Sequence, residues 1–339
     1  MTAVRVLVVD DSAFARKVVR ESLEISPHID VVATARDGID ALEKIAALQP
    51  DVITLDLVMP NLDGLGVLAA LTPAQRARVI VVSMADEDSD IGVAALGFGV
   101  FDLVHKPTAL AVASLHDIAD ELVSRVLLAA AQAPARSREL ATPPVVTQGA
   151  TSDRVVLIGT STGGPQALTR LLKAFPANFP APIAIVLHIP AGYTGPLAER
   201  LNSECELEVL EARDGLELLP GRAVLAQAGL HMRVVSEGER VTVQLGSEPL
   251  ASVHRPSVDV LFASAARSIG KRALGVVLTG MGDDGLAGSR AICEAGGQVL
   301  TETEESCVVY GMPRVVKEAG LSSAEEPLER MAGAIASRV

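Results

Sequence analysis

Short apolar runs alternate with longer amphipathic stretches in the first third of the chain. The runs are rich in Val, Ile and Leu, and they lie at residues 4–9, 29–35, 52–57, 79–84 and 100–104. Helical periodicity marks the stretches between them, at 12–25, 37–47 and 86–97. Such alternation is typical of α/β proteins, in which helices cover both faces of a parallel sheet. We therefore expect a parallel five-stranded sheet in this part of the chain.

A similar alternation returns after residue 152. Apolar runs at 154–159, 183–187 and 275–279 are separated by helical patterns. The segment 207–245 differs, because its shorter runs are broken by Pro-Gly and Glu-Gly turn signals. We expect a doubly wound α/β domain that carries a β-rich insertion.

Residues 126–152 separate these two regions. They contain the segments Ala-Gln-Ala-Pro-Ala-Arg-Ser-Arg and Ala-Thr-Pro-Pro, in which prolines and low hydrophobicity disfavour both packing and regular structure. We interpret 126–152 as a flexible interdomain linker between domains at 1–125 and 153–339. A chain of 339 residues is long enough for two such domains, each with its own core.

Composition and charge narrow the classes of protein. The formal net charge is -13, and an acidic surface argues against nucleic acid as a partner. The three cysteines, Cys205, Cys293 and Cys307, have no C-x-x-C spacing, so neither a disulfide framework nor a zinc site is expected. The apolar run near the N-terminus is too short for a signal peptide, and no apolar stretch reaches 18 residues. We expect a cytoplasmic protein without direct membrane insertion.

Acidic residues follow two of the N-terminal strands at the same edge of the expected sheet. Asp10 and Asp11 follow the first strand, and Asp56 follows the third. Clustered carboxylates favour a hard cation with oxygen ligands, usually Mg²⁺. Ser83 ends the fourth strand and Lys106 follows the fifth, so a hydroxyl and a cation join this edge. The five positions together predict a phosphoryl-accepting carboxylate site, although single acids after strands are as often helix caps.

Residues 1–125 resemble a response-regulator receiver domain, which has a flavodoxin-like fold. The motifs that carry the resemblance are Val-Val-Asp-Asp-Ser, Leu-Asp-Leu-Val-Met-Pro-Asn-Leu-Asp-Gly, Val-Ser-Met and His-Lys-Pro. The resemblance implies that Asp56 accepts the phosphoryl group from a histidine kinase. It also implies that Asp10, Asp11 and Asp56 bind Mg²⁺ together with the carbonyl of Val58, and that Ser83 and Lys106 sense the phosphate.

A glycine-rich turn follows the first strand of the second domain. It reads Gly-Thr-Ser-Thr-Gly-Gly-Pro from residue 159 and leads into a helical pattern. A Walker phosphate loop is excluded because Pro165 stands where its lysine is needed. A dinucleotide fingerprint is excluded because Ser161 takes the place of its second glycine. The turn does match G-x-S-x-G, which presents a serine nucleophile at a strand end.

A base and an acid follow two further strands of this domain. His188 comes directly after the strand at 183–187, and Asp284 lies in the glycine-rich turn after the strand at 275–279. Together with Ser161 they form a candidate nucleophile, general base and orienting carboxylate. His231 and His254 are competing bases, but neither directly follows a core strand, so we expect them to serve substrate contact or structure. A lone histidine after a strand is more often structural, and paired acids between glycines are often only a turn.

Residues 153 to about 335 resemble the catalytic domain of chemotaxis protein-glutamate methylesterases of the CheB type. The motifs are Ile-Gly-Thr-Ser-Thr-Gly-Gly-Pro, His-Ile-Pro-Ala-Gly-Tyr-Thr, His-Arg-Pro-Ser-Val-Asp, Leu-Thr-Gly-Met-Gly-Asp-Asp-Gly and Val-Val-Tyr-Gly-Met-Pro. The resemblance implies that Ser161, His188 and Asp284 form a catalytic triad, with Thr162 and Met281 near the oxyanion. It implies hydrolysis of glutamate methyl esters on methyl-accepting chemoreceptors, deamidation of receptor glutamines as a second reaction, and activation by phosphorylation.

Two other classes of function compete with this one. A non-catalytic signalling module would use the first domain to take up phosphoryl groups and the second only to dock on receptors. A general serine esterase would act on small-molecule esters. An intact set of Ser, His and Asp argues against the first alternative, and the lack of an obvious aromatic acyl pocket makes the second less attractive.

Overall fold

The computed structural model describes residues 3–76, 78–83, 89–106, 115–131, 152–238 and 240–339. Its contacts divide the chain into two compact units, Met1–Arg136 and Ser137–Val339, which are described separately below. None of the described helices is both long enough and apolar enough to cross a membrane. All three cysteines are free thiols.

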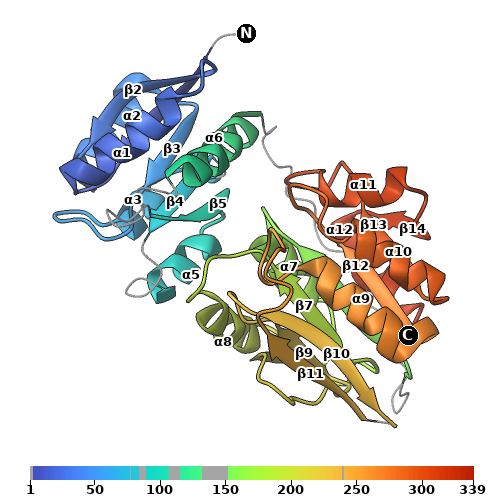
Figure 1. Ribbon diagram of the computed structural model, residues 1–339. Helices are drawn as coiled ribbons and strands as arrows, with labels where there is room; N and C mark the ends of the chain where they lie inside the picture. The colour runs from blue at the N-terminus through green and yellow to red at the C-terminus, as the bar shows by residue number, and fades with distance from the viewer. Residues whose placement is uncertain (1–2, 77, 84–88, 107–114, 132–151, 239) are drawn as a thin grey trace. The chain divides into compact units, whose positions relative to one another are not determined.

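A five-stranded parallel sheet forms the N-terminal unit, as the apolar runs predicted (Figure 1). Its order is β2-β1-β3-β4-β5, and all its pairings are parallel. The strands are β1 (Val4–Val9), β2 (Ile29–Ala35), β3 (Val52–Leu55), β4 (Val79–Ser83) and β5 (Asp102–His105). The central strands β3 and β4 are buried at every position, as expected where helices cover both faces of the sheet.

Six helices among the described residues accompany this sheet. They are α1 (Ala13–Glu24), α2 (Gly38–Leu48), α3 (Gly64–Ala70), α4 (Pro73–Arg76), α5 (Ser89–Gly97) and α6 (Leu115–Ala131). The side chains of Ser12, Asp37 and Asp63 accept backbone N–H bonds at the starts of α1, α2 and α3. Helix α1 packs against α6, whereas α2 packs against α3. The fold class expected for this region is confirmed.

Helix α6 bears on the expected linker. It continues to Ala131 because its apolar face, including Val126 and Ala129, is buried. The first residues of the segment 126–152 are therefore helical. Most of that segment, residues 132–151, lies outside the described part of the chain.

A seven-stranded parallel sheet forms the centre of the C-terminal unit (Figure 1). Its order is β14-β13-β12-β6-β7-β9-β8, and all its pairings are parallel. The strands are β6 (Val155–Thr160), β7 (Ile183–Leu187), β8 (Glu208–Glu211), β9 (Arg222–Leu225), β12 (Ala273–Val277), β13 (Gln298–Glu302) and β14 (Ala324–Glu326). From β6 the chain builds the sheet toward β7, and after β9 it returns to the other side of β6 with β12. The strand order therefore reverses at β6, which is where doubly wound proteins bind ligands.

Helices and one hairpin surround this sheet. The helices are α7 (Gly164–Leu172), α8 (Thr194–Glu204), α9 (Val258–Ile269), the 3-10 turn η2 (Gly270–Arg272), α10 (Leu286–Glu294), α11 (Met312–Glu318) and α12 (Leu328–Ala336). The antiparallel hairpin of β10 (His231–Glu237) and β11 (Arg240–Gly246) forms a separate sheet, and β10 packs on α9. Of the strands in the segment 207–245, β8 and β9 instead extend the main sheet. The β-rich insertion is thus confined to the hairpin.

Candidate functional site

The turn after β6 presents Ser161. Gly163 adopts φ +79°, and a Cβ there would lie 2.5 Å from the Cβ of Val308, so both conformation and space require glycine. The N–H of Gly164 donates to the carbonyl of Ser161 at 2.7 Å, which closes the turn at the start of α7. Ser161 is buried at this strand end. The sequence motif therefore forms the expected sharp strand-to-helix turn.

Thr279, just beyond β12, holds the turn from the neighbouring strand. Its carbonyl accepts the N–H of Ser161 at 3.0 Å and the hydroxyl of Thr160 at 2.8 Å. Its own hydroxyl donates to the carbonyl of Thr162 at 3.0 Å, and its N–H donates to the buried carboxyl of Glu302 at 2.9 Å. The N–H of Ser161 is thus already engaged. An oxyanion has to find its donors elsewhere in the site.

His188 follows β7 and meets Asp284, which follows β12. The His188 Nε2 lies 2.8 Å from Asp284 Oδ2, and both side chains are buried. The Nδ1 atom of the same ring is buried without a hydrogen-bond partner among the described residues. When Nε2 carries the proton that faces a carboxylate, Nδ1 has a free lone pair. Nδ1 is thus the ring atom that can accept a proton.

Three further donors surround the carboxylate of Asp284. The Ser257 hydroxyl and the Asp259 N–H donate to its Oδ1, each at 2.9 Å, and the Val258 N–H donates to its Oδ2 at 2.8 Å. Burial alone would raise the pKa of Asp284, but the bonds from His188 and the backbone N–H groups outweigh it and lower the pKa to about 2. Asp284 is therefore a carboxylate at neutral pH.

Thr162 and Met281 lie in the two loops that flank Ser161. Thr162 is buried in the nucleophile turn, and Met281 is half-buried next to Gly280. A Cβ on Gly280 would lie 2.8 Å from the Cβ of Ser161, so the two loops are in close contact. The structure thus brings both residues expected near the oxyanion to the neighbourhood of the nucleophile.

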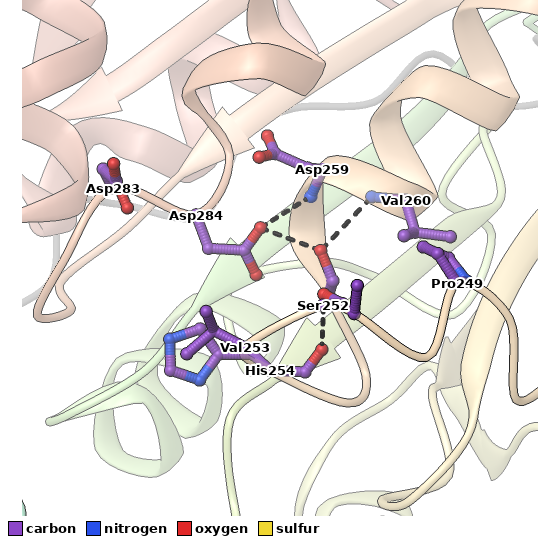
Figure 2. Close-up of a pocket in the computed structure, with 10 residues that line it drawn as sticks. Pro249, Ser252, Val253, His254, Asp259, Val260, Asp283 and Asp284 are labelled. Atoms are coloured by element: carbon purple, nitrogen blue, oxygen red, sulfur yellow. Dashed lines mark hydrogen bonds between the residues drawn. The ribbon is translucent and has the colours of Figure 1, made fainter.

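The two competing histidines have different surroundings. His231 on β10 is fully buried, its Nε2 lies 3.2 Å from the carbonyl of Pro249, and burial lowers its pKa. His254 instead stacks on the ring of His188. His254 also lines a cavity of about 420 Å³ with Asp284 (Figure 2). His231 is thus placed as a structural residue, whereas His254 belongs to the site.

The acids of the N-terminal unit also converge. Asp10, Asp11 and Asp56 offer carboxylate oxygens that all lie within 4.8 Å of one another. Lys106 Nζ bridges two of them, at 2.8 Å from Asp10 Oδ2 and 2.9 Å from Asp56 Oδ2. The N–H of Lys106 donates to the carbonyl of Ser83 at 2.9 Å, so the ends of β4 and β5 meet here. The acidic pocket suits Mg²⁺, because three clustered carboxylates form an oxygen-only donor set.

Burial dominates the ionisation of this pocket. It raises the pKa of Asp56 to about 6, although Lys106 pulls in the opposite direction. It also raises the pKa of Asp10 above its ordinary value. A bound cation would offset the burial of this charge. Val58, whose carbonyl was expected at the metal, lies two residues after Asp56 on a half-exposed stretch of the same loop.

Several residues that surround Ser161, His188 and Asp284 were not identified as site residues from sequence. Ser257 caps α9 and holds Asp284, and its position at the start of a helical pattern was the only local signal. Thr279 and Glu302 had none, because their bonds link strands that are remote in the chain. The stacking of His254 on His188 likewise depends on how a loop folds back.

Comparisons with known proteins find families that match both units of the chain. The family described as CheB methylesterase matches residues 156–335, and the family described as response regulator receiver domain matches residues 6–117. A "protein-glutamate methylesterase/protein-glutamine glutaminase 5" of Myxococcus xanthus is 58% identical over 98% of this chain and 97% of that protein. A relative with the same name, without the number, from Symbiobacterium thermophilum is 43% identical over 99% of this chain and 97% of its own length.

One solved structure supports the second unit in particular. The crystal structure of the Thermotoga maritima CheB methylesterase catalytic domain is 38% identical, with a TM-score of 0.54. The match covers 56% of this chain and all of that chain.

Proposed function

The chain belongs to the CheB methylesterase family, and we propose that it hydrolyses glutamate methyl esters on chemoreceptors when its receiver domain is phosphorylated. The observation that carries this proposal is the contact between His188 and Asp284, together with the positions of Ser161, His188 and Asp284 at the ends of neighbouring strands. They follow β6, β7 and β12, which are adjacent strands at the point where the strand order reverses. The full-length match to enzymes named as methylesterases and glutaminases supports the choice of substrate.

Acylation follows from the positions of the three side chains. The Ser161 Oγ attacks the γ-carbonyl carbon of the methylated glutamate, and its proton passes to His188 Nδ1. Asp284, ionised because its pKa is lowered to about 2, stabilises the imidazolium through Nε2. Backbone N–H groups near Thr162 and Met281 serve the oxyanion, since the N–H of Ser161 already donates to Thr279. The imidazolium then gives its proton to the departing methoxide, which leaves as methanol.

Deacylation reverses these roles. Water attacks the acyl carbon, His188 takes a proton from the water, and the ester bond to Ser161 breaks. The released product is a receptor glutamate, and the serine recovers its proton from His188. Deamidation of a receptor glutamine uses the same steps, with ammonia leaving in place of methanol.

The receiver domain controls this reaction in the proposal. The carboxylate of Asp56 attacks the phosphoryl group of a partner histidine kinase, so that an acyl phosphate forms and the phosphorus–nitrogen bond breaks. Asp10, Asp11, Asp56 and the Val58 carbonyl would hold Mg²⁺, which supplies positive charge to the phosphate oxygens when bound. Within the chain, Lys106, which pairs with Asp56, would leave it and contact the new phosphate, and Ser83 would supply a hydroxyl.

Methanol release from methylated receptors tests the hydrolase. The full chain should release methanol, and Ser161→Ala should abolish release, whereas Ser203→Ala on the exposed face of α8 should release it normally. Normal release by Ser161→Ala would overturn the mechanism. A full chain that cleaves a chromogenic ester but not methylated receptor would point to a general serine esterase.

Stimulation by a small phosphodonor, such as acetyl phosphate with Mg²⁺, tests the switch. The wild type should release methanol faster when the donor is added, and Asp56→Asn should not respond. Asp30→Asn, an exposed change on β2, is the matched control and should respond like the wild type. An unaltered response in Asp56→Asn would rule out phosphorylation at this residue as the signal.

A further inference from the structure

The imidazole of His254 lies against the imidazole of His188. Their ring centroids are 4.1 Å apart and the ring planes differ by 18°, so the two rings are stacked. His254 stands outside the chain of Ser161, His188 and Asp284 through which the proton moves. Its ring nevertheless packs against the face of the His188 ring.

The segment that carries His254 also holds the carboxylate of the triad. The Ser252 hydroxyl donates to the carbonyl of His254 at 2.9 Å, and this bond closes the turn that carries the His254 ring (Figure 2). A few residues later, the Ser257 hydroxyl and the N–H groups of Val258 and Asp259 surround Asp284. One short segment thus contacts both the face of the base and the oxygens of its orienting acid.

The same segment is tied in turn to the loop of Asp284. The carboxylate of Asp259 accepts the N–H of Gly285 at 2.9 Å and that of Gly288 at 2.6 Å, at the start of α10. The Asp259 N–H in turn donates to the Asp284 carboxylate, so hydrogen bonds run in both directions between the two loops, and Figure 2 shows this last bond. A residue on this segment has a fixed position relative to the triad, and His254 shares that rigidity.

A hydrogen bond to one ring nitrogen does not by itself fix an imidazole. The bond from Nε2 to Asp284 sets a distance, but the ring can still rotate about that axis and swing Nδ1 away from the nucleophile. A flat surface in contact with one face opposes rotation toward that face, because such a rotation drives the ring into the surface. His254 provides such a surface at the wall of the cavity.

We infer that His254 is a positioning residue, which holds the ring plane of His188 so that Nδ1 faces Ser161 while Nε2 stays on Asp284. The inference rests on the proposed function, since it requires His188 to be the base. It adds to that function a role for the His-Arg-Pro-Ser-Val-Asp motif, whose histidine holds the orientation of the base. The ring acts through its flat shape and not through proton transfer.

The experiment compares two substitutions in the full chain by methanol release from methylated receptors. His254→Ala removes the surface and should lower kcat by about 10- to 100-fold, as expected for a misplaced catalytic group, with KM within about threefold of the wild type. His254→Phe keeps a flat ring without nitrogens and should restore kcat to within about threefold. Leu250→Ala, an exposed change in the same loop, is the matched control and should leave both constants unchanged.

A spectroscopic reading separates positioning from a general structural effect. The proton on His188 Nε2, bonded to Asp284, should give a downfield NMR resonance in the wild type and in His254→Phe. The resonance should broaden or vanish in His254→Ala. Normal kcat in His254→Ala overturns the inference, and so does a Phe variant as impaired as the Ala variant. A Ser161→Ala protein with normal activity would instead overturn the proposed function, so the two failures are distinguishable.

Discussion

Two buried aspartates, one in each unit, have pKa values that are shifted in opposite directions. Asp56 in the receiver has its pKa raised to about 6, whereas Asp284 in the esterase has its pKa lowered to about 2. Both are buried and both contact a basic side chain. The difference lies in their other neighbours. Asp284 accepts three bonds besides that of His188, whereas Asp56 has Lys106 and the N–H of Leu57, and faces the like charge of Asp10.

This contrast distinguishes two uses of a buried acid. Asp284 is solvated by fixed protein donors, so its charge is stable without help from outside and can orient a base at any moment. Asp56 has fewer donors, so its negative charge is unfavourable in the folded protein. A bound cation or a covalent modification would lower this free-energy cost. In our proposal Asp284 is the catalytic carboxylate and Asp56 the switch carboxylate, and the two differ in the number of donors that surround them.

We expect the largest effect on activity when the negative charge of Asp284 is removed. Asp284→Asn should lower kcat/KM for methanol release by about 10³- to 10⁴-fold, because the base loses its orienting carboxylate. Asp153→Asn, at an exposed position of the same unit, is the control and should have no effect. Loss of less than about tenfold would mean that Asp284 is not the orienting acid.

The same variant gives the pH dependence of stability. The pKa of Asp284 is depressed in the folded chain, so its stabilising contribution is present above the ordinary pKa near 4 and is lost as the pH falls toward 2. The wild type should exceed Asp284→Asn by about 2 kcal/mol in unfolding free energy near pH 6. Chemical denaturation from pH 6 to pH 2 should show this gap closing; a constant gap would contradict the depressed pKa.

Removing the charge of Asp56 should have the opposite effect on stability to removing that of Asp284. In chelator at pH 8, Asp56→Asn should stabilise the receiver by on the order of 2 kcal/mol, because the under-solvated charge disappears while Lys106 keeps Asp10. Calorimetry of the full chain measures the receiver transition. A less stable receiver in Asp56→Asn would show that the charge of Asp56 is favourable in the folded state. Asp56 and Asp284 would then not differ in the way described above.

Lys106 should compete with Mg²⁺ for the same carboxylates. Lys106→Met removes a cation 2.8 Å from Asp10 and 2.9 Å from Asp56, so Mg²⁺ should bind about tenfold more tightly at pH 8. Calorimetric titration with Mg²⁺ gives the affinity, and Lys44→Met, which loses the pair with Asp40 and the bond to the Thr34 carbonyl, is the control. Equal affinity in the two variants would show that the lysine does not occupy the metal's place.

We expect the smallest effect, a change in stability, when one hydrogen-bond donor to Asp284 is removed. Ser257→Ala loses the hydroxyl that donates to Asp284 and caps α9, so the esterase unit should lose about 1 kcal/mol of stability. Ser257→Thr keeps the hydroxyl and should retain most of it. Thermal unfolding of the two variants measures the difference, and equal losses would mean that the bond itself contributes little.

The sheets were predictable because buried parallel strands are continuous apolar runs. The run at 183–187 matches β7 at both ends, and the run at 4–9 matches β1. Strands β8 and β9 were assigned to an insertion instead, since runs of four residues do not show which sheet they join. Strand pairing is a long-range property that local periodicity does not contain.

The candidate site was predictable to a similar depth. Residues that follow parallel strands share one edge, so Ser161, His188 and Asp284 could be expected to meet without any knowledge of their rotamers. Which ring nitrogen of His188 faces Asp284 depends on the path of two loops, and no local pattern encodes it. The same holds for His254, whose ring reaches the base only because Ser252 and Asp259 anchor its segment.

The reversal of strand order at β6 has a consequence for the timing of synthesis. The proposed base and its acid are 96 residues apart in the chain, and the N–H of Ser161 donates to Thr279, which lies just beyond the late strand β12. A nascent chain that has completed β6 and β7 possesses the nucleophile and the base but neither their support nor the acid. Hydrolytic activity therefore first becomes available when β12 and the loop after it have left the ribosome and inserted beside β6. By then the receiver that controls the enzyme in our proposal has already been made.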